Sequence, residues 1–421
     1  MTAERASLAR LWALMLTVFV DMVGFLIILP LLPFYATRLG ASAFVVGLMV
    51  SAYAVAQLAT APAWGRLSDG HGRRPMLMLG VVIAATSHAV FGLACSDWAI
   101  GRFDSRGLIA LLFLSRFVQG AGGASTAVVQ AYIGDAVVPE ERAMALGWIS
   151  AATSAGVMIG PALGSAISNL GPAAPGFAAA GLCLVNLAIV RRYLPESASD
   201  ESRHEARSAP RGSLTLRMLQ VLAQPKRPVS RLVLIYGAAM MAFMAMNAML
   251  ALFLQARFGF TERSIGYVYA AVGTVSLLMR SVVLGPAVRR FGERGSMRLG
   301  LVALALGFAL QPLAPHLALF AVALVLIPIG TALLFPATSS LVSRYSQRHE
   351  LGVTMGVQQG YGGVARFAGP IWAGAAFQYL GAGAPFYLSA ALTVGTLLFA
   401  LGLEPPPVDR TAAARIVTPL A

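Results

Sequence analysis

The chain has 421 residues, of which 58% are apolar and 11% are charged, whereas an ordinary soluble domain carries roughly 25% charged residues. This composition excludes a typical soluble protein and indicates that most of the chain lies in lipid. The formal net charge is +14, but the arginines lie between apolar runs, where positive-inside topology places them, so we expect no nucleic-acid partner.

Apolar runs long enough to cross the hydrocarbon core, which takes about 20 residues, recur along the chain. In chain order we predict membrane-spanning helices over residues 11–33, 44–65, 76–95, 107–130, 143–167, 173–193, 230–254, 264–286, 298–314, 317–342, 353–376 and 384–403. The pattern predicts an all-α membrane protein of twelve transmembrane helices in two pseudo-symmetric six-helix bundles. We expect no separate signal peptide, because the first apolar run is itself long enough to span the membrane.

The distribution of arginine predicts the orientation. Even-numbered connections are generally richer in arginine than odd-numbered ones, as in the second connection with Arg66, Arg73 and Arg74. The fourth connection is an exception, but acidic residues contribute little to this rule. Both termini and the long sixth connection are therefore expected in the cytoplasm.

A polar segment divides the chain into three parts. Residues 1–193 are predicted to form an N-terminal six-helix bundle, residues 194–229 a cytoplasmic linker, and residues 230–421 a C-terminal six-helix bundle with a short tail. The linker is charged and rich in Ser and Ala, which is typical of flexible segments. A short amphipathic helix is possible within it, around residues 214–222.

The two bundles are related by an internal repeat. In the first half Gly147 precedes the pair Gly160-Pro161, and in the second half Gly356 precedes the pair Gly369-Pro370 by the same number of residues. A glutamate also precedes Gly147 and Gly356 at the same distance along the chain. Repeated six-helix units are typical of secondary transporters, whose solute site lies between the halves near the membrane midplane.

Two of four local motifs are rich in glycine. The first is Gly65-Arg-Leu-Ser-Asp69-Gly-His-Gly72-Arg73-Arg74-Pro between the second and third spans. Its glycines permit a tight turn, and its aspartate can pair with arginine; an ordinary basic turn that fixes topology is the alternative. The second, in the fifth span, contains Gly156, Gly160, Pro161 and Gly164. Small residues at this spacing allow close helix packing, and proline bends the helix.

The other two motifs place charges inside apolar spans. Arg116 stands three residues before Gln119 in the fourth span, and Asp21 precedes Gly24, Pro30 and Pro33 in the first. A charged group at the bilayer centre costs at least roughly 2.5–3.5 kcal/mol, so each side chain should face a partner or a cavity.

Together the four motifs strongly resemble those of the major facilitator superfamily, in particular its twelve-helix drug/proton antiporter branch, which includes the tetracycline exporters. The resemblance covers essentially the whole chain. It implies that Asp69, Arg73 and Asp135 form a charge network that locks the outward-facing state. It also implies that Arg116 assists proton coupling, and that the glycines and proline of the fifth span shape its contact with the other half.

The chain departs from the tetracycline exporters in one respect. Those proteins carry an aspartate on the ninth helix, whereas residues 300–314 contain no acidic residue. In addition, the loop of the second half that corresponds to the first motif has Arg289 in place of the aspartate. The sequence therefore leaves the cargo open.

Asp21 is the strongest candidate for the proton-coupling site, because burial raises a carboxyl pKa while a nearby arginine lowers it. A structural ion pair is the alternative. Arg366 could bind an anionic substrate, pair with Asp21 or cap a polar patch. Polar and methionine side chains in or near the spans supply further candidates for the substrate cavity, although methionines also serve as core filler. The cavity candidates are Gln57, Gln119, Met244, Asn247, Gln358 and Arg366.

The favoured function is proton-coupled efflux of lipophilic or amphipathic small molecules, without a cofactor or metal and driven by the proton gradient. The alternatives are proton-coupled import of an organic solute, such as a siderophore or acidic metabolite, and a membrane-embedded enzyme or scaffold. No nucleophile constellation, metal cluster or nucleotide-binding motif occurs in the sequence, so we expect no catalytic residues. By analogy, we expect a monomer surrounded by lipid in the bacterial inner membrane.

Overall fold

The structure is a computed structural model, and it describes residues 3–123, 125–138, 141–197, 214–347 and 350–403. The regular structure in these ranges is helical, as lipid requires, because each backbone N–H and C=O must be paired within its own segment. The first half contains α1 (Ala3–Ile28), α2 (Leu32–Arg38), α3 (Ala43–His71), α4 (Arg73–Ala94), α5 (Asp97–Ile100), α6 (Ser105–Gly122), α7 (Ser125–Ala136), α8 (Arg142–Ile167), η1 (Ser168–Leu170) and α9 (Ala174–Tyr193). After α11 (Leu214–Ala223), the second half contains α12 (Pro228–Phe258), α13 (Glu262–Leu278), the π-helix η2 (Met279–Val283), α14 (Leu284–Leu310), α15 (Leu317–Tyr345), α16 (Leu351–Leu380) and α17 (Ala384–Leu401).

Nine helices in the described part of the chain are long and apolar enough to cross a membrane. One of them runs from Glu262 to Leu310 and contains Gly292, whose φ of 68° interrupts the helix. The spans predicted at 107–130 and 353–376 fall on α6 with α7 and on α16, which are outside these nine. The all-α membrane fold is thus confirmed, while the count of twelve stays a prediction.

The outer surface of the helices is strongly apolar. Large side chains such as Leu79, Val82, Leu184 and Leu398 are exposed on three different helices. Soluble monomers rarely expose contiguous apolar patches of more than a few hundred Å². The surface therefore matches acyl chains better than water.

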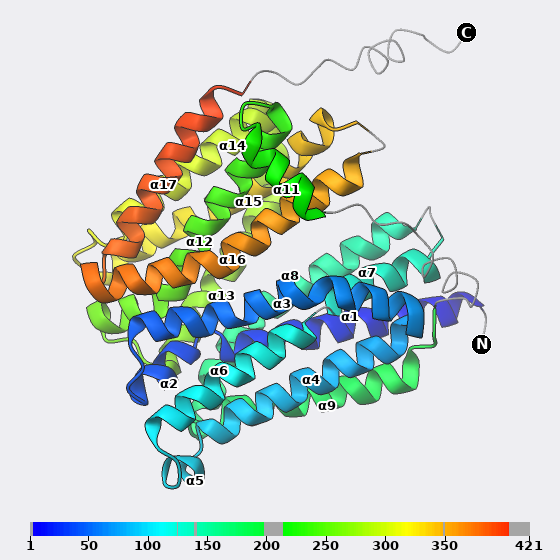
Figure 1. Ribbon diagram of the computed structural model, residues 1–421, viewed down its shortest axis with the longest axis vertical. Coiled ribbons are helices and arrows are strands. Elements are labelled where there is room, and N and C mark those ends of the chain that lie inside the picture. The colour runs from blue at the N-terminus through cyan, green and yellow to red at the C-terminus, as the bar shows by residue number, and fades with distance from the viewer. Residues whose placement is uncertain (1–2, 124, 139–140, 198–213, 348–349, 404–421) are drawn as a thin grey trace.

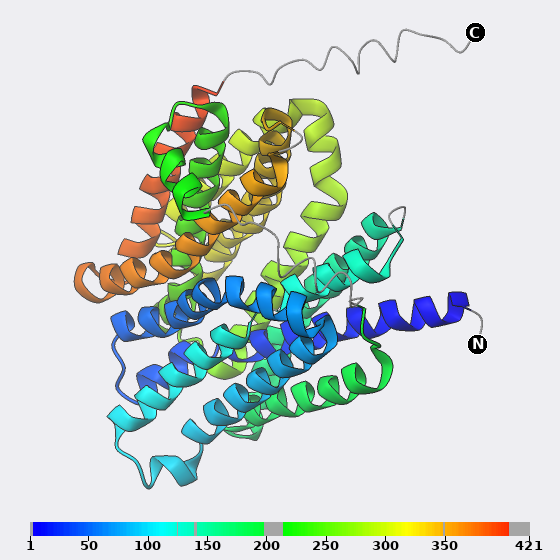
Figure 2. The same cartoon turned by 45° about the vertical axis from the view of Figure 1, so that its right-hand side comes forward.

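The helices form two bundles, one before and one after the linker (Figure 1). The end at which α1 begins and α17 ends is called the terminal end, and the opposite end, with α2 and α5, is called the far end. In both views the bundles lie together toward the far end and diverge toward the terminal end (Figure 2).

The contacts between the bundles involve two helix crossings, α3 with α16 and α8 with α13. The Ser51 hydroxyl donates to the carbonyl of Phe367 at 2.6 Å, and the Ser165 hydroxyl donates to the carbonyl of Glu262 at 2.6 Å. The Arg38 guanidinium at the end of α2 also pairs with the Glu262 carboxylate at 2.5 Å. These polar contacts hold the far end of the molecule closed.

The predicted amphipathic helix of the linker is confirmed as α11, which packs on α12 and α16. Val221 joins Val233 and Val357 in a small apolar cluster. The Tyr361 hydroxyl donates to the backbone carbonyl of Met218 at 2.9 Å. The linker helix is thus attached to the second bundle at the terminal end.

Candidate functional site

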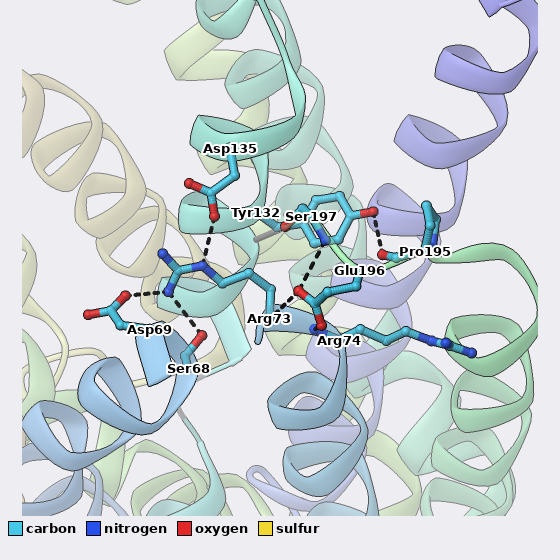
Figure 3. A network of polar contacts seen from close by, with 9 residues as sticks. All are labelled: Ser68, Asp69, Arg73, Arg74, Tyr132, Asp135, Pro195, Glu196 and Ser197. Atoms are coloured by element: carbon cyan, nitrogen blue, oxygen red, sulfur yellow. Dashed lines mark hydrogen bonds and ion pairs between the residues drawn. The ribbon is translucent and has the colours of Figure 1, made fainter. Parts of the chain in front are cut away.

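The structure brings Asp69, Arg73 and Asp135 together at the terminal end of the first bundle (Figure 3). Arg73 Nη1 lies 2.6 Å from the Asp69 carboxylate, and Arg73 Nε lies 2.9 Å from that of Asp135. The same Nη1 also donates to the Ser68 hydroxyl at 3.1 Å. Gly72, with φ of 102°, makes the turn that places Arg73 at the start of α4.

A carboxylate that sequence reasoning missed caps α4. Glu196 accepts from the backbone N–H groups of Arg73 at 2.7 Å and Arg74 at 3.2 Å (Figure 3). These donors have no partner within their own helix, and a negative charge is favourable at a helix N-terminus. The Arg74 side chain instead donates to the carbonyl of Arg191 at 2.6 Å. These groups belong to the first half and, in the case of Glu196, to the start of the linker, so the network forms without contact with the second half.

The glycines of the fifth predicted span contact a different helix from the one expected. Cβ atoms added to Gly156, Gly160 and Gly164 would lie within 3 Å of Met22, Leu26 and Ile27 of α1, respectively. Their common face therefore packs on α1 of the same half, and their role in shaping the contact with the other half stays a prediction. Pro161 does reach the other half: its carbonyl oxygen would lie 1.9 Å from a Cβ on Gly266 of α13. Gly65, in the first motif, has open space where its Cβ would be.

Arg116 is the largest of the fully buried side chains and is only 1% exposed. Its guanidinium carbon lies 5.2 Å from the ring centre of Phe25 and 5.1 Å from that of Tyr53. It also donates to the side-chain oxygen of Gln119, whose amide nitrogen lies 3.3 Å from His88 Nε2. The predicted pair Arg116 and Gln119 therefore forms a buried polar group inside the first bundle, with aromatic rings stabilising the cation.

Tyr53, on α3, connects this polar group with the other charged candidates. The charges of Asp21, Arg116 and Arg366 all act on its hydroxyl group. Gln57, another candidate, donates to the same hydroxyl at 3.2 Å and to the carbonyl of Gly123 at 2.8 Å. Because Arg366 belongs to the second half, charges of both halves meet around Tyr53.

The remaining cavity candidates also belong to the second half. Gln358 is fully buried and donates to the Ser339 hydroxyl at 2.9 Å. Asn247 is partly buried, and its backbone carbonyl accepts from the Tyr269 hydroxyl at 3.0 Å. Met244 packs beside Gly369, at the crossing of α12 and α16. Among the six candidates, Gln57 contacts Tyr53 directly and Gln119 contacts Arg116.

Sequence reasoning also missed an ion pair that repeats the first-half network with reversed charges. Glu293 follows Gly292, as Arg73 follows Gly72, and pairs with Arg344 at 2.6 Å. The Ser340 hydroxyl donates to the same carboxylate at 2.5 Å. The internal repeat aligns Arg344 with Asp135, because both precede the matching glutamates by the same interval, so the repeat could have identified this pair.

Two helical bundles that are joined at one end and have opposed charges between them define a membrane transporter rather than an enzyme. The family model described as Major Facilitator Superfamily matches residues 14–309 and 232–419, and the chain belongs to this superfamily. Within the described residues, no cluster of three or more His, Cys, Asp or Glu side chains could hold a metal ion.

Similar proteins include exporters of the expected branch. The chain is 27% identical to multidrug resistance protein 2 of Bacillus subtilis (strain 168), over 86% of this chain and 88% of that protein. It is 28% identical to the class C tetracycline resistance protein of Escherichia coli, over 95% and 96% of the two chains. Among solved structures, that of the human organic anion transporter MFSD10 matches with a TM-score of 0.66 and 24% identity, covering 94% of this chain and 99% of that chain. The resemblance to tetracycline-type exporters is thereby confirmed.

Proposed function

We propose that this protein exports lipophilic or amphipathic small molecules in exchange for protons, by alternating access between its two halves. The observation that carries the proposal is the buried Arg116 beside Tyr53, on whose hydroxyl group the charges of Asp21 and Arg366 also act. A carboxylate in that position can take up and release a proton as the two halves alternate. The bacterial relatives are multidrug and tetracycline resistance proteins, which supports an efflux function.

In this proposal the terminal end faces the cytoplasm of a bacterial inner membrane. The arginine-rich connections at that end support the orientation. Residues 1–193 and 230–421 act as the two moving units, with 194–229 as the linker and a single chain as the functional unit. The protein then needs no cofactor, and the proton gradient drives transport.

The network of Asp69, Arg73 and Asp135 serves as part of the conformational switch. Its two ion pairs hold α3, α4 and α7 together. A rigid terminal end would let the first half move as one body when the halves close there. If this network is to lock the outward-facing state, it must contact the second half when the two halves close at the terminal end.

Transport in proteoliposomes tests the proposal. The wild-type chain should accumulate a lipophilic fluorescent compound when the lumen is acidic and should release lumenal protons at the same time. In Asp21→Asn the gradient-driven accumulation should be at least tenfold lower than in the wild type. The variant should still exchange the compound across the membrane when no proton gradient is present. The control Asp97→Asn changes a carboxylate in the short far-end helix α5 and should behave like the wild type. Normal proton-driven accumulation by Asp21→Asn would exclude Asp21 as the coupling site.

Import of an acidic organic solute is the second candidate, and Arg366 is the observation that favours it. A cation near the middle of α16 suits an anionic nutrient as well as an anionic export substrate. Vesicles of opposite orientation distinguish the two directions. Accumulation only in right-side-out vesicles, without an efflux phenotype, would favour import.

A further inference from the structure

Arg366 lies near the middle of the thirty-residue helix α16, at a depth where an arginine needs a polar partner. The ion pairs found in the described part of the chain are Arg38–Glu262, Arg73–Asp69, Arg73–Asp135, Arg217–Glu350 and Arg344–Glu293. None of them includes Arg366, although its side chain is partly buried. The helix therefore carries a cation at membrane depth that forms no ion pair with a carboxylate of the residues that the structure describes.

An aromatic and methionine-rich cluster lies beside this cation. The rings of Tyr236 and Phe335 meet edge to face at 5.2 Å, and Phe243 lies 6.4 Å from Phe335. Met241 and Met244 pack against the same cluster, which includes Ala365, the neighbour of Arg366 in the chain. A Cβ on Gly362 would lie 3.0 Å from the Tyr236 ring and 3.7 Å from Arg366 Nη1, so the ring and the guanidinium flank one point of α16.

The charge balance around Tyr53 favours an anion over a cation. Two arginines, Arg116 and Arg366, act on its hydroxyl group, against the single carboxylate of Asp21. When Asp21 is protonated, the charge that the described side chains place there is entirely positive. An organic cation would meet net repulsion in that state, whereas an acid would be attracted.

We propose that Arg366 binds the acid group of an amphipathic organic anion, whose apolar body packs against Tyr236, Phe335 and Met244. The planar guanidinium can hold a carboxylate or sulfonate through two parallel hydrogen bonds. Aromatic rings and flexible thioethers accept varied apolar shapes, which suits a site for more than one such compound. This inference names the substrate class of the proposed transporter and therefore rests on that function.

Binding of three probes with one apolar body tests this assignment. The probes are a naphthyl alkanoate, its neutral amide and the corresponding amine, measured by calorimetry with the full chain in detergent and no pH gradient. The wild type should bind the carboxylate at least tenfold more tightly than the amide or the amine. Arg366→Gln should lose this preference while its affinity for the amide stays the same. Arg366→Lys should keep part of the preference, because an ammonium group retains the charge but not the paired donors.

Arg290→Gln is the matched control, since it removes an exposed arginine at the terminal end of α14. It should bind all three probes like the wild type. Equal wild-type affinities for carboxylate and amide would overturn the assignment without any variant, even if Arg366→Gln failed to fold. An unchanged preference in Arg366→Gln would also overturn it.

The outcome is separable from that of the transport proposal. Selective carboxylate binding without proton-driven movement would leave the anion site intact and refute proton-coupled export. Proton-driven transport of the amide and the amine, with no carboxylate preference, would refute the anion site and leave the export function standing.

Discussion

At the scale of single residues, Arg116 shows how a transporter keeps a charge that stability alone would not favour. Its guanidinium is held between Phe25 and Tyr53, and Gln119 accepts one of its hydrogen bonds. Its Nε and Nη2 atoms are buried without a hydrogen-bond partner. Even a buried ion pair can often be replaced by apolar residues of similar volume with unchanged stability or a gain of roughly 1–4 kcal/mol, because the cost of desolvating the charges is removed.

We therefore expect Arg116→Met to unfold at the same temperature as the wild type or higher, while proton-coupled transport falls at least tenfold. Thermal unfolding in detergent and transport in proteoliposomes would measure the two effects. Arg116→Lys, which keeps a charge but loses the stacked planar group, should lie between them in transport. A Met variant that transports normally would show that Arg116 is a packing residue only.

At the scale of elements, the crossing of α8 and α13 is one of the close approaches between the halves. The Gly266 N–H donates to the Ser165 hydroxyl at 2.8 Å, and a Cβ on Gly266 would lie 1.9 Å from the Pro161 carbonyl oxygen. Only a glycine permits this distance. Overpacking of a close contact typically costs 1–3 kcal/mol.

Gly266→Val should therefore push α13 away from α8 and reduce the population of molecules closed at the far end about tenfold. Distances between spin labels on α5 and on the turn before α17 would report the change. Gly181→Val is the control, because nothing lies within 4 Å of its Cβ position. Identical distance distributions in the two variants would contradict the prediction.

The attachment of α11 is a second element-scale feature. The Met218 sulfur would lie 3.0 Å from a Cβ on Gly360, whereas the neighbouring side chain of Leu219 is 57% exposed. Met218→Ala should detach α11, because removal of a packed large side chain typically costs 2–5 kcal/mol. Hydrogen exchange of 214–223 should then become at least tenfold faster, with Leu219→Ala as the unchanged control. Equal exchange in both variants would show that the helix is held by other contacts.

At the scale of the whole molecule, the balance between the two access states depends on contacts such as the ion pair of Arg38 and Glu262. The Arg38 side chain is 48% exposed, so the pair is expected to contribute only about 0.2–1 kcal/mol. A contribution of that size still changes the ratio of two states by up to about fivefold.

Arg38→Glu should shift the protein toward opening at the far end, because it places two carboxylates side by side. The double variant Arg38→Glu/Glu262→Arg should restore the wild-type balance. Cysteine cross-linking between α2 and α13 at several salt concentrations would measure the shift, which should shrink as salt screens the charges. An equal shift in the single and double variants would show that the pair does not set the balance.

Much of the fold could be predicted from the sequence, because a membrane imposes its rules locally. Neighbouring residues alone are enough to recognise the apolar runs of spanning length, the turn at Gly72 and the amphipathic segment 214–223. The internal repeat and the four motifs then identified the superfamily. The same local information placed Arg73 near Asp69, which lies four residues earlier, before the turn at Gly72.

The partners of these elements were decided by the tertiary structure. The small residues of α8 were expected to shape its contact with the other half, and only the packed structure shows that the three glycines lie against α1 while Pro161 meets α13. Arg38 and Glu262 are 224 residues apart, and no local pattern relates them. Tyr53 was not a candidate at all, because its importance comes from charges on α1, α6 and α16 that only the packed halves bring to one point. The sequence by itself determined that the chain is a two-bundle membrane transporter, since hydropathy and repeats act along the chain. Only the tertiary structure decided which side chains face one another, since helix rotation and crossing depend on contacts between distant segments.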